Sequence, residues 1–149
     1  MIVKLEENLN KEDIEVLIKY AQMNSTVERV VSLIKSIDST VKCSLEHREI
    51  WVNVSDIYYI ESVDKKTFVY CDKSVYRTEY RLYQFLDAFE FPGFVQISKS
   101  CLININVLIS IRPLANSKME ATLSNGERVN VTRKYVANIK EYLLRRQLV

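Results

Sequence analysis

The chain has 149 residues, of which 48% are hydrophobic and 27% charged, a composition that excludes a long disordered chain and is typical of a globular domain. Its net charge of +2 is unevenly distributed. Residues 1–92 hold 12 Lys and Arg against 16 Asp and Glu, net −4, whereas residues 93–149 hold 9 against 3, net +6. The basic C-terminal part predicts an anionic partner, although an unevenly charged solvated surface would give the same counts.

Missing residue types exclude most catalytic and cofactor sites. The two glycines, Gly93 and Gly126, cannot form a P-loop, a dinucleotide-binding GxGxxG or a GxSxG nucleophile elbow. One histidine, His47, and three widely spaced cysteines without a CxxC pair predict no metal site. We therefore expect no enzyme, no cofactor and no small-molecule substrate. The acidic start lacks a signal-peptide core and no apolar run could span a membrane, which predicts a cytoplasmic protein.

Residues 1–38 are expected to form a β-β-α segment. "MIVKLEE" is a candidate strand, and "DIEVLIKYA" alternates like a second one, although Leu17 and the acidic start would also suit a helix. In "NSTVERVVSLIKSID" the period becomes that of an amphipathic helix, with an apolar stripe of Val27, Val30, Val31, Ile34 and Ile37. Asn24 or Ser25 can cap this helix, and Glu28 follows Ser25 at capping-box spacing. The segment can pack on the rest of the chain or use the stripe to form a homodimer.

Short strands and one short helix are predicted between residues 40 and 93. "EIWVNVSDIYYIES" alternates in two pieces, and the charged "VDKK" ends the second. "TFVYCDKSVYRT" predicts a hairpin whose turn is Asp72-Lys73-Ser74. "YRLYQFLDAFEFPG" predicts a short helix that ends at Pro92-Gly93. Its apolar side would consist of Leu82, Phe85, Leu86 and Phe89.

The stretch "FVQISKSCLININVLISI", residues 94–111, is apolar at every odd position except Lys99. A lone ammonium group buried on an apolar strand face would cost on the order of several kcal/mol. We therefore expect the strand to be interrupted by an exposed turn at Ser98-Lys99-Ser100 and to continue through Leu102–Val107. A bulge from which the lysine side chain reaches water is the alternative.

The last 32 residues predict a hairpin followed by a helix. In "KMEATLSNGERVNVT" two alternating strands flank Asn125-Gly126, a pair that favours a two-residue type I′ turn. "RKYVANIKEYLLRR" then has Val136, Ile139 and Leu143 at helical spacing.

Three junctions between predicted elements combine cations with hydroxyl groups. They are Lys65, Lys66 and Thr67; Ser98, Lys99 and Ser100; and Arg133 and Lys134, which follow the potential helix cap Thr132. Ammonium, guanidinium and hydroxyl groups are the donors that bind nucleic-acid phosphates, and helix N-termini accept anions. Exposed lysines in turns are common, so each junction alone is weak evidence for a phosphate site.

From about Thr40 to Leu144 the chain resembles the LytTR family of DNA-binding domains, found at the C-terminus of many bacterial response regulators. The family's strand that ends in Ile-Glu corresponds to "DIYYIES". Its Phe-Val-Arg-Val-His-Arg-Ser-Tyr-Leu-Val-Asn motif corresponds to "FVQISKSCLIN", and its Asn-Gly hairpin with a following Val-Ser-Arg-x-Tyr corresponds to "LSNGERVNVTRKY".

The resemblance implies a mainly β (α+β) fold, an antiparallel LytTR-like domain with short helices at residues 40–149. The β-β-α segment expected from the pattern of residues 1–38 precedes it. The resemblance also implies sequence-specific binding of double-stranded DNA through loops, at paired direct repeats, and thus transcription regulation. The DNA-binding residues would be Lys65, Lys66, Thr67, Ser98, Lys99, Ser100, Arg133 and Lys134. A short helical turn can follow the His-Arg-Ser loop in this family, and Asn104, which matches the motif's asparagine, can be structural instead.

Two departures support a different interpretation. Ser98 and Lys99 replace the usual His-Arg, and a lysine lacks the planar fork that reads guanine bidentately. Arg133 retains this fork and is the better candidate for a base contact. The alternative function is a protein-interaction module that regulates a partner without specific DNA binding. Residues 1–38 are too few for a receiver domain, and similar stand-alone proteins often accompany a small membrane protein, which implies control by such a partner.

Overall fold

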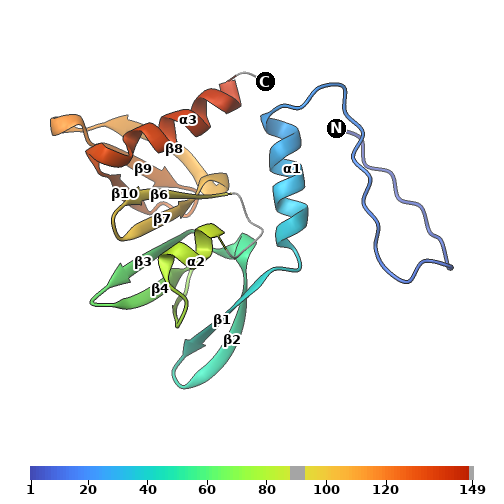
Figure 1. Ribbon diagram of the computed structural model, residues 1–149, viewed down its shortest axis with the longest axis horizontal. Helices are drawn as coiled ribbons and strands as arrows, with labels where there is room; N and C mark the ends of the chain where they lie inside the picture. The colour runs from blue at the N-terminus through green and yellow to red at the C-terminus, as the bar shows by residue number, and fades with distance from the viewer. Residues whose placement is uncertain (88–92, 148–149) are drawn as a thin grey trace.

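The computed structural model describes residues 1–87 and 93–147, an exposed N-terminal segment followed by a β-rich body (Figure 1). Its helices are α1 (Ser25–Ser36), α2 (Leu82–Asp87) and α3 (Val136–Gln147). The strands are β1 (Thr40–Leu45), β2 (Arg48–Asn53), β3 (Tyr59–Val63), β4 (Lys66–Tyr70), β5 (Val75–Thr78), β6 (Phe94–Ser98), β7 (Cys101–Asn104), β8 (Leu108–Pro113), β9 (Met119–Leu123) and β10 (Arg128–Val131). Single helical turns connect some of them: η1 (Val54–Asp56), η2 (Ile105–Val107), η3 (Ala115–Ser117) and η4 (Arg133–Tyr135).

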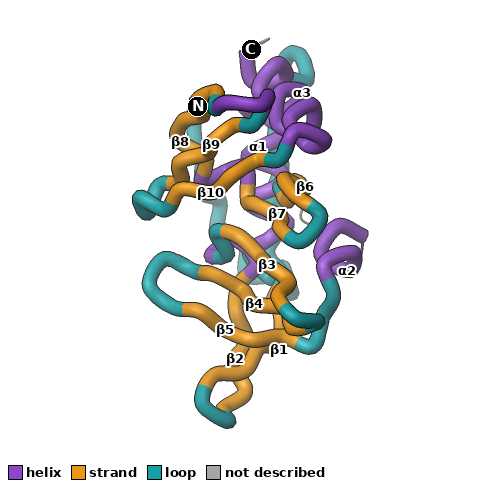
Figure 2. Tube along the Cα trace, turned by 90° about the vertical axis from the view of Figure 1, so that its left-hand side faces the viewer, coloured by secondary structure: helices purple, strands orange, loops and turns teal. Residues whose placement is uncertain are grey.

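The described strands form two antiparallel sheets, which confirms the predicted fold class. The larger sheet has the order β2-β1-β5-β4-β3-β7-β6, and the smaller has the order β10-β9-β8. Figure 2 shows the smaller sheet and α3 together at one end of the molecule, beyond β6 and β7. No described helix has both the length and the apolar character needed to cross a membrane.

Two hydrophobic clusters lie on opposite faces of the larger sheet where β3, β7 and β6 meet. Successive strand residues point to opposite faces. Ile60 and Leu102 accordingly belong to one cluster, and their neighbours Tyr59 and Ile103 to the other. The smaller sheet and α3, through buried Ile139, close the second cluster. Because both faces are covered here, β7 is apolar at consecutive positions rather than at alternate ones.

The predicted N-terminal strands are wrong, whereas the helix after them is confirmed. Residues 1–24 form no strand, because the apolar side chains of "DIEVLIKYA" have no neighbouring strand or core in the described chain to cover them. Helix α1 follows, and Asn24 is its cap, accepting a hydrogen bond from the N–H of Val27 at its side-chain oxygen (3.0 Å). Further along, α2 places Phe85 in the first cluster, while Phe89 and Pro92 of the predicted helix lie outside the described residues.

The turn at Asn125-Gly126 has a different type from the predicted one. The N–H of Gly126 donates to the carbonyl of Leu123 (2.9 Å), and Gly126 alone among these loop residues has a positive φ, 88°. This is a three-residue loop, a tight turn followed by a left-handed residue, rather than a type I′ turn. The described two-residue loops with both φ values positive are Glu46-His47 and Asp64-Lys65, neither of which contains glycine.

The strand after Lys99 is shorter than predicted because Asn104 ends it. The Asn104 side chain is 1% exposed; its amide donates to the carbonyl of Ile57 (2.9 Å) and its oxygen accepts from the N–H of Asn106 (3.0 Å). The second bond caps η2, where the chain leaves the larger sheet and enters the smaller one. The short helical turn that the family resemblance implied is therefore present, and Asn104 has a structural role.

Candidate nucleic-acid interface

The β3–β4 turn and the β6–β7 turn lie next to each other. Strands β3 and β7 pair in antiparallel fashion, so the end of β3 lies beside the start of β7. The N–H of Ser62 donates to the carbonyl of Ser100 at 2.8 Å, one residue beyond the paired part of β7. The chain turns at Asp64-Lys65, shortly after Ser62, and at Lys99, immediately before Ser100. The sheet therefore brings two of the three predicted basic segments together.

The third basic segment joins them through β6. The backbone N–H of Thr132 donates to the carbonyl of Ile97 (3.0 Å), and the Thr132 hydroxyl lies 3.4 Å from the same oxygen. Asn138 of α3 donates from its side chain to the carbonyl of Gln96 (3.3 Å). These bonds hold η4, which contains Arg133, beside the end of β6. Residues 35 and 42 positions apart in sequence thus meet at one side of the protein.

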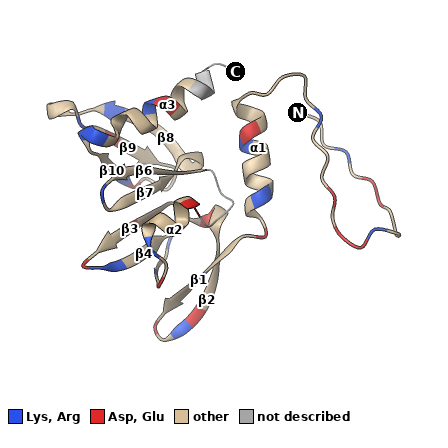
Figure 3. Cartoon of the chain, in the orientation of Figure 1, with Lys and Arg blue, Asp and Glu red and all other residues tan. Residues whose placement is uncertain are grey.

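The cations at this side are accessible. Those of the three segments are exposed, namely Lys65, Lys66, Lys99, Arg133 and Lys134. None of them takes part in the ion pairs found between described residues. Figure 3 marks basic residues along the left-hand side of the view, at the β3–β4 and β6–β7 turns and at the start of α3. Unneutralised cations on one side create a positive potential that attracts a polyanion.

The hydroxyl-bearing residues are placed less uniformly than predicted. Thr67 is 2% exposed and pairs with Ser62, because β4 already begins at Lys66 and alternation turns the next side chain inward. Thr67 therefore cannot reach DNA from its position in this structure. Ser100 is exposed, whereas Ser98 is half-buried and its hydroxyl oxygen accepts from the N–H of Ser100 (3.3 Å). The Ser98 hydroxyl still carries a proton that it can donate.

Thr132 does not cap the following helix as its position suggested. Its side chain accepts no bond from the backbone of η4 and points to Ile97 instead. The ammonium nitrogen of Lys134 lies 5.7 Å from the ring centroid of Tyr135, within the range of a cation–π contact. Lys134 is thus oriented along its own helical turn, whereas Arg133 directly follows Thr132, whose bonds to Ile97 hold this segment beside β6.

Arg81 belongs to this surface and was not predicted from the sequence. Its guanidinium donates to the carbonyl of Lys65 at 2.7 Å, which fixes the β3–β4 turn to the residue before α2. The contact joins residues 16 positions apart, so no local pattern indicated it. Asp64 forms the first position of the same turn and places one carboxylate among these cations. The turn and Arg81 together remain net positive.

Cys101 follows the β6–β7 turn and is not a reactive thiol. Burial, with the nearby carboxylate of Glu61 as a smaller cause, raises the pKa of Cys101 from 9.0 to about 12. At neutral pH the side chain is the protonated thiol, which is a weak nucleophile and a poor metal ligand. No group of three or more metal-ligating side chains occurs among the described residues.

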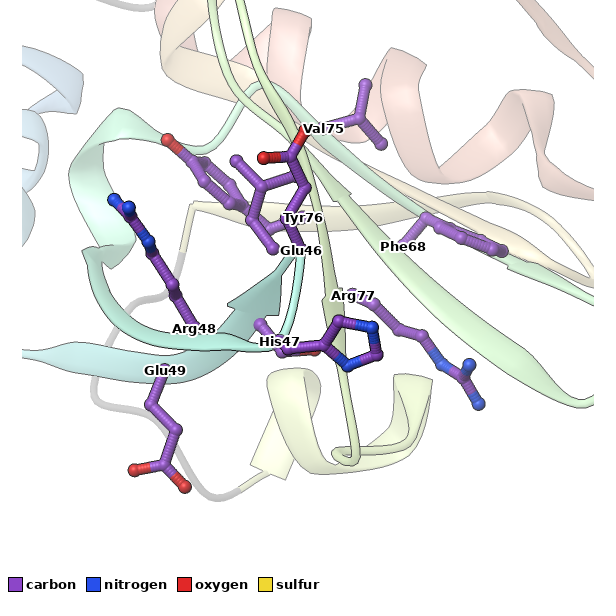
Figure 4. A pocket seen from close by; sticks show the side chains of 10 residues that line it. Glu46, His47, Arg48, Glu49, Phe68, Val75, Tyr76 and Arg77 are labelled. Carbon is purple, nitrogen blue, oxygen red and sulfur yellow. The ribbon is translucent and has the colours of Figure 1, made fainter.

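A separate hollow lies at the other edge of the larger sheet (Figure 4). The β1–β2 hairpin and strands β4 and β5 line it. Its charged side chains have mixed signs: Glu46, Arg48, Glu49 and Arg77, with His47 beside them. Because these charges largely cancel, the hollow does not extend the basic surface.

A comparison with known proteins matches the part of the chain that contains the three basic segments. The model of a family described as LytTr DNA-binding domain matches residues 47–144. Among solved structures, the chain is similar to the LytTr DNA-binding domain of a putative methyl-accepting/DNA response regulator from Bacillus cereus, with a TM-score of 0.66 and 28% identity. That match covers 71% of this chain and 97% of the other.

Curated relatives extend beyond the matched region. Sensory transduction protein LytT of Bacillus cereus is 27% identical over 135 residues, which are 87% of this chain and 55% of that protein. Sensory transduction protein LytR of Streptococcus agalactiae is 27% identical over 119 residues, 80% of this chain and 48% of that protein. The chain thus spans about half the length of these relatives.

Proposed function

Because this chain belongs to the family of LytTr DNA-binding domains, we propose that it regulates transcription by binding double-stranded DNA through three segments: the β3–β4 turn, the β6–β7 turn and η4. The observation that carries the proposal is the convergence of exposed cations from these segments at one side of the protein. Backbone hydrogen bonds from Ser62 to Ser100 and from Thr132 to Ile97 hold the segments together.

The residues have different roles in this proposal. Lys65, Lys66 and Lys99 contact phosphates, because an ammonium group on a turn is a point charge without directional preference. Arg133 contacts a base edge, since its planar fork can donate two parallel hydrogen bonds to guanine. Exposed Ser100 adds a phosphate contact, and Ser98, Lys134 and Arg81 support the segments or add weaker contacts.

The regulator binds paired direct repeats as a homodimer in the cytoplasm, and a membrane protein controls its activity. Two basic surfaces on one dimer would contact two half-sites at once, which raises the effective concentration of the second contact. The family membership and the basic surface support the DNA-binding part of this proposal.

The test is fluorescence anisotropy of the full chain with DNA from the gene's own upstream region, over a salt series and with scrambled DNA as competitor. Lys99→Ala should flatten the slope of log K against log salt by about 0.9, the value for one phosphate contact. Lys73→Ala is the matched control, because Lys73 is an exposed lysine in the hairpin turn at the opposite end of β4. It should leave the slope unchanged.

A variant at Arg133 distinguishes sequence-specific base recognition from nonspecific electrostatic attraction. Arg133→Lys keeps the charge but removes the fork, so the salt slope should persist while the preference for native over scrambled DNA falls by about 1–3 kcal/mol. A wild-type protein without any preference would contradict specific DNA binding. That result would favour the alternative, a protein-interaction module. The lysine at position 99, where the family motif has an arginine, supports this alternative.

A further inference from the structure

Residues 1–23, here called the arm, make no described contact with the body of the protein. In Figure 1 the arm extends from the start of α1 away from both sheets. Its hydrogen bonds are internal, such as that from the N–H of Lys11 to the carbonyl of Asn8 (3.1 Å). Its ion pair, between Lys11 and Glu15, is internal as well. Every arm residue except Ile18 is exposed.

The arm exposes an unusual number of large apolar side chains. Their exposed fractions run from 52% at Tyr20 to 96% at Leu5. The others are Met1, Ile2, Val3, Leu9, Ile14, Val16, Leu17 and Met23. Soluble monomers rarely leave so many large apolar side chains of one segment in water, and extensive exposed apolar surface marks an interaction site.

Helix α1, to which the arm is attached, is also incompletely covered. Its most buried residues are Ser32 and Ser36, and the Ser32 hydroxyl is buried without a hydrogen-bond partner. Residues two positions apart lie on opposite sides of a helix, so Val30 and Ile34 are on the side away from these serines. That apolar stripe is only half-buried, and Ile37 at its end is 61% exposed. An amphipathic helix normally buries its apolar side.

We propose that the arm of one copy packs along the α1 stripe of a second copy, and that the reciprocal contact forms an arm-exchanged homodimer. Each chain carries both an exposed extended apolar segment and an incompletely covered helical stripe, which is the requirement for a twofold, self-complementary interface. In the structure the arm does not pack on its own α1, so in the proposed dimer the segment that completes the cover of the stripe comes from the other copy.

Size and charge support a second copy as the partner. A specific interface uses about 20–30 residues from each side, and the arm alone provides a segment of that length. The arm holds three lysines and five acidic residues, net −2, whereas α1 holds one acidic residue and two basic ones, net +1. The opposite signs favour contact between arm and helix over contact between two arms.

Sedimentation velocity of the full chain without DNA tests the proposal separately from DNA binding. We expect a dimer at micromolar concentration. Ile14→Asp with Leu17→Asp should weaken dimerisation by about a hundredfold or more, because two apolar side chains are lost and two charges are buried in their place. Lys19→Asp, which changes a polar position of the same segment, should leave a dimer. The mutated side chains touch no core, so far-UV circular dichroism should not change.

A separate variant tests the α1 stripe, the surface on which the arm of the other copy packs. Ile37→Asp should also give monomers, since the side chain ends the stripe but is exposed within one chain. Methyl NOEs between arm and α1 should appear in a mixture of labelled and unlabelled copies, between copies only. A monomeric wild type, a dimer that survives both sets of aspartates, or arm–helix NOEs within one copy would overturn the proposal. A monomeric wild type would also remove the homodimer from the proposed function, but the tests of DNA contact at Lys99 and Arg133 would stand unchanged.

Discussion

Replacing Asn104 by alanine should destabilise the protein without changing its contacts with DNA. The side chain is 1% exposed and makes two hydrogen bonds, to the carbonyl of Ile57 and from the N–H of Asn106. Asn104→Ala leaves both partners unsatisfied, at a cost of about 1–3 kcal/mol for each fully buried group. Because η2 is partly accessible, we expect a total loss of about 2–4 kcal/mol, a large part of a typical unfolding free energy of about 5–15 kcal/mol.

Urea unfolding followed by circular dichroism measures this loss, and Asn106→Ala provides the matched control. The Asn106 amide nitrogen is buried with no hydrogen-bond partner among the described residues, so its removal leaves no new unsatisfied group. The control should therefore lose clearly less stability than Asn104→Ala. If the unfolding free energy of Asn104→Ala lay within about 0.5 kcal/mol of the wild-type value, the structural role of Asn104 would be refuted. A salt slope flatter by about one unit would instead assign Asn104 to the DNA contact.

Three further results are expected. Burial raises the pKa of the thiols from 9.0, to about 11 for Cys43 and about 12 for Cys71 and Cys101. The folded protein holds these protons more tightly than the unfolded chain, so the stabilisation is complete below about pH 9 and is lost as the pH rises through those values. The urea midpoint should therefore fall above about pH 9, and a rising midpoint would contradict the assignment. Arg81→Ala should weaken DNA binding, because it removes a cation and the bond that fixes the Lys65 carbonyl. An unchanged DNA affinity in the anisotropy titration would show that Arg81 lies outside the interface. Thr67→Val should leave the salt slope unchanged, and a flatter slope would place that hydroxyl at the DNA.

The two lysine-bearing turns could be predicted because a charge interrupts an apolar pattern. Lys99 breaks an alternation of apolar residues, and the structure confirms the turn there, between β6 and β7. The prediction that the Thr67 hydroxyl is available to DNA failed for a related reason. Strand β4 begins at Lys66, and a strand that starts one residue earlier than assumed turns every following side chain to the other face. Sequence pattern located the break but not the register after it.

Turn type was less predictable than turn position. Asn125-Gly126 has the composition of a type I′ turn, yet the loop contains three residues, because the bond from Gly126 to Leu123 closes the turn one residue earlier. Glu46-His47 and Asp64-Lys65 adopt positive φ without glycine. Their strands are paired on both sides of each loop, so sheet pairing overrides the local cost of the left-handed conformation.

The convergence of the basic segments could not be read from any window of the sequence. It depends on backbone hydrogen bonds from Ser62 to Ser100 and from Thr132 to Ile97, which join segments that are distant in the chain. Backbone groups have the same chemistry at every residue, so these bonds do not depend on which side chains the turns carry. The turn at Lys99 can therefore carry lysine in place of arginine without altering the sheet. For the same reason, changes at these positions should alter which DNA is bound before they alter whether the domain folds.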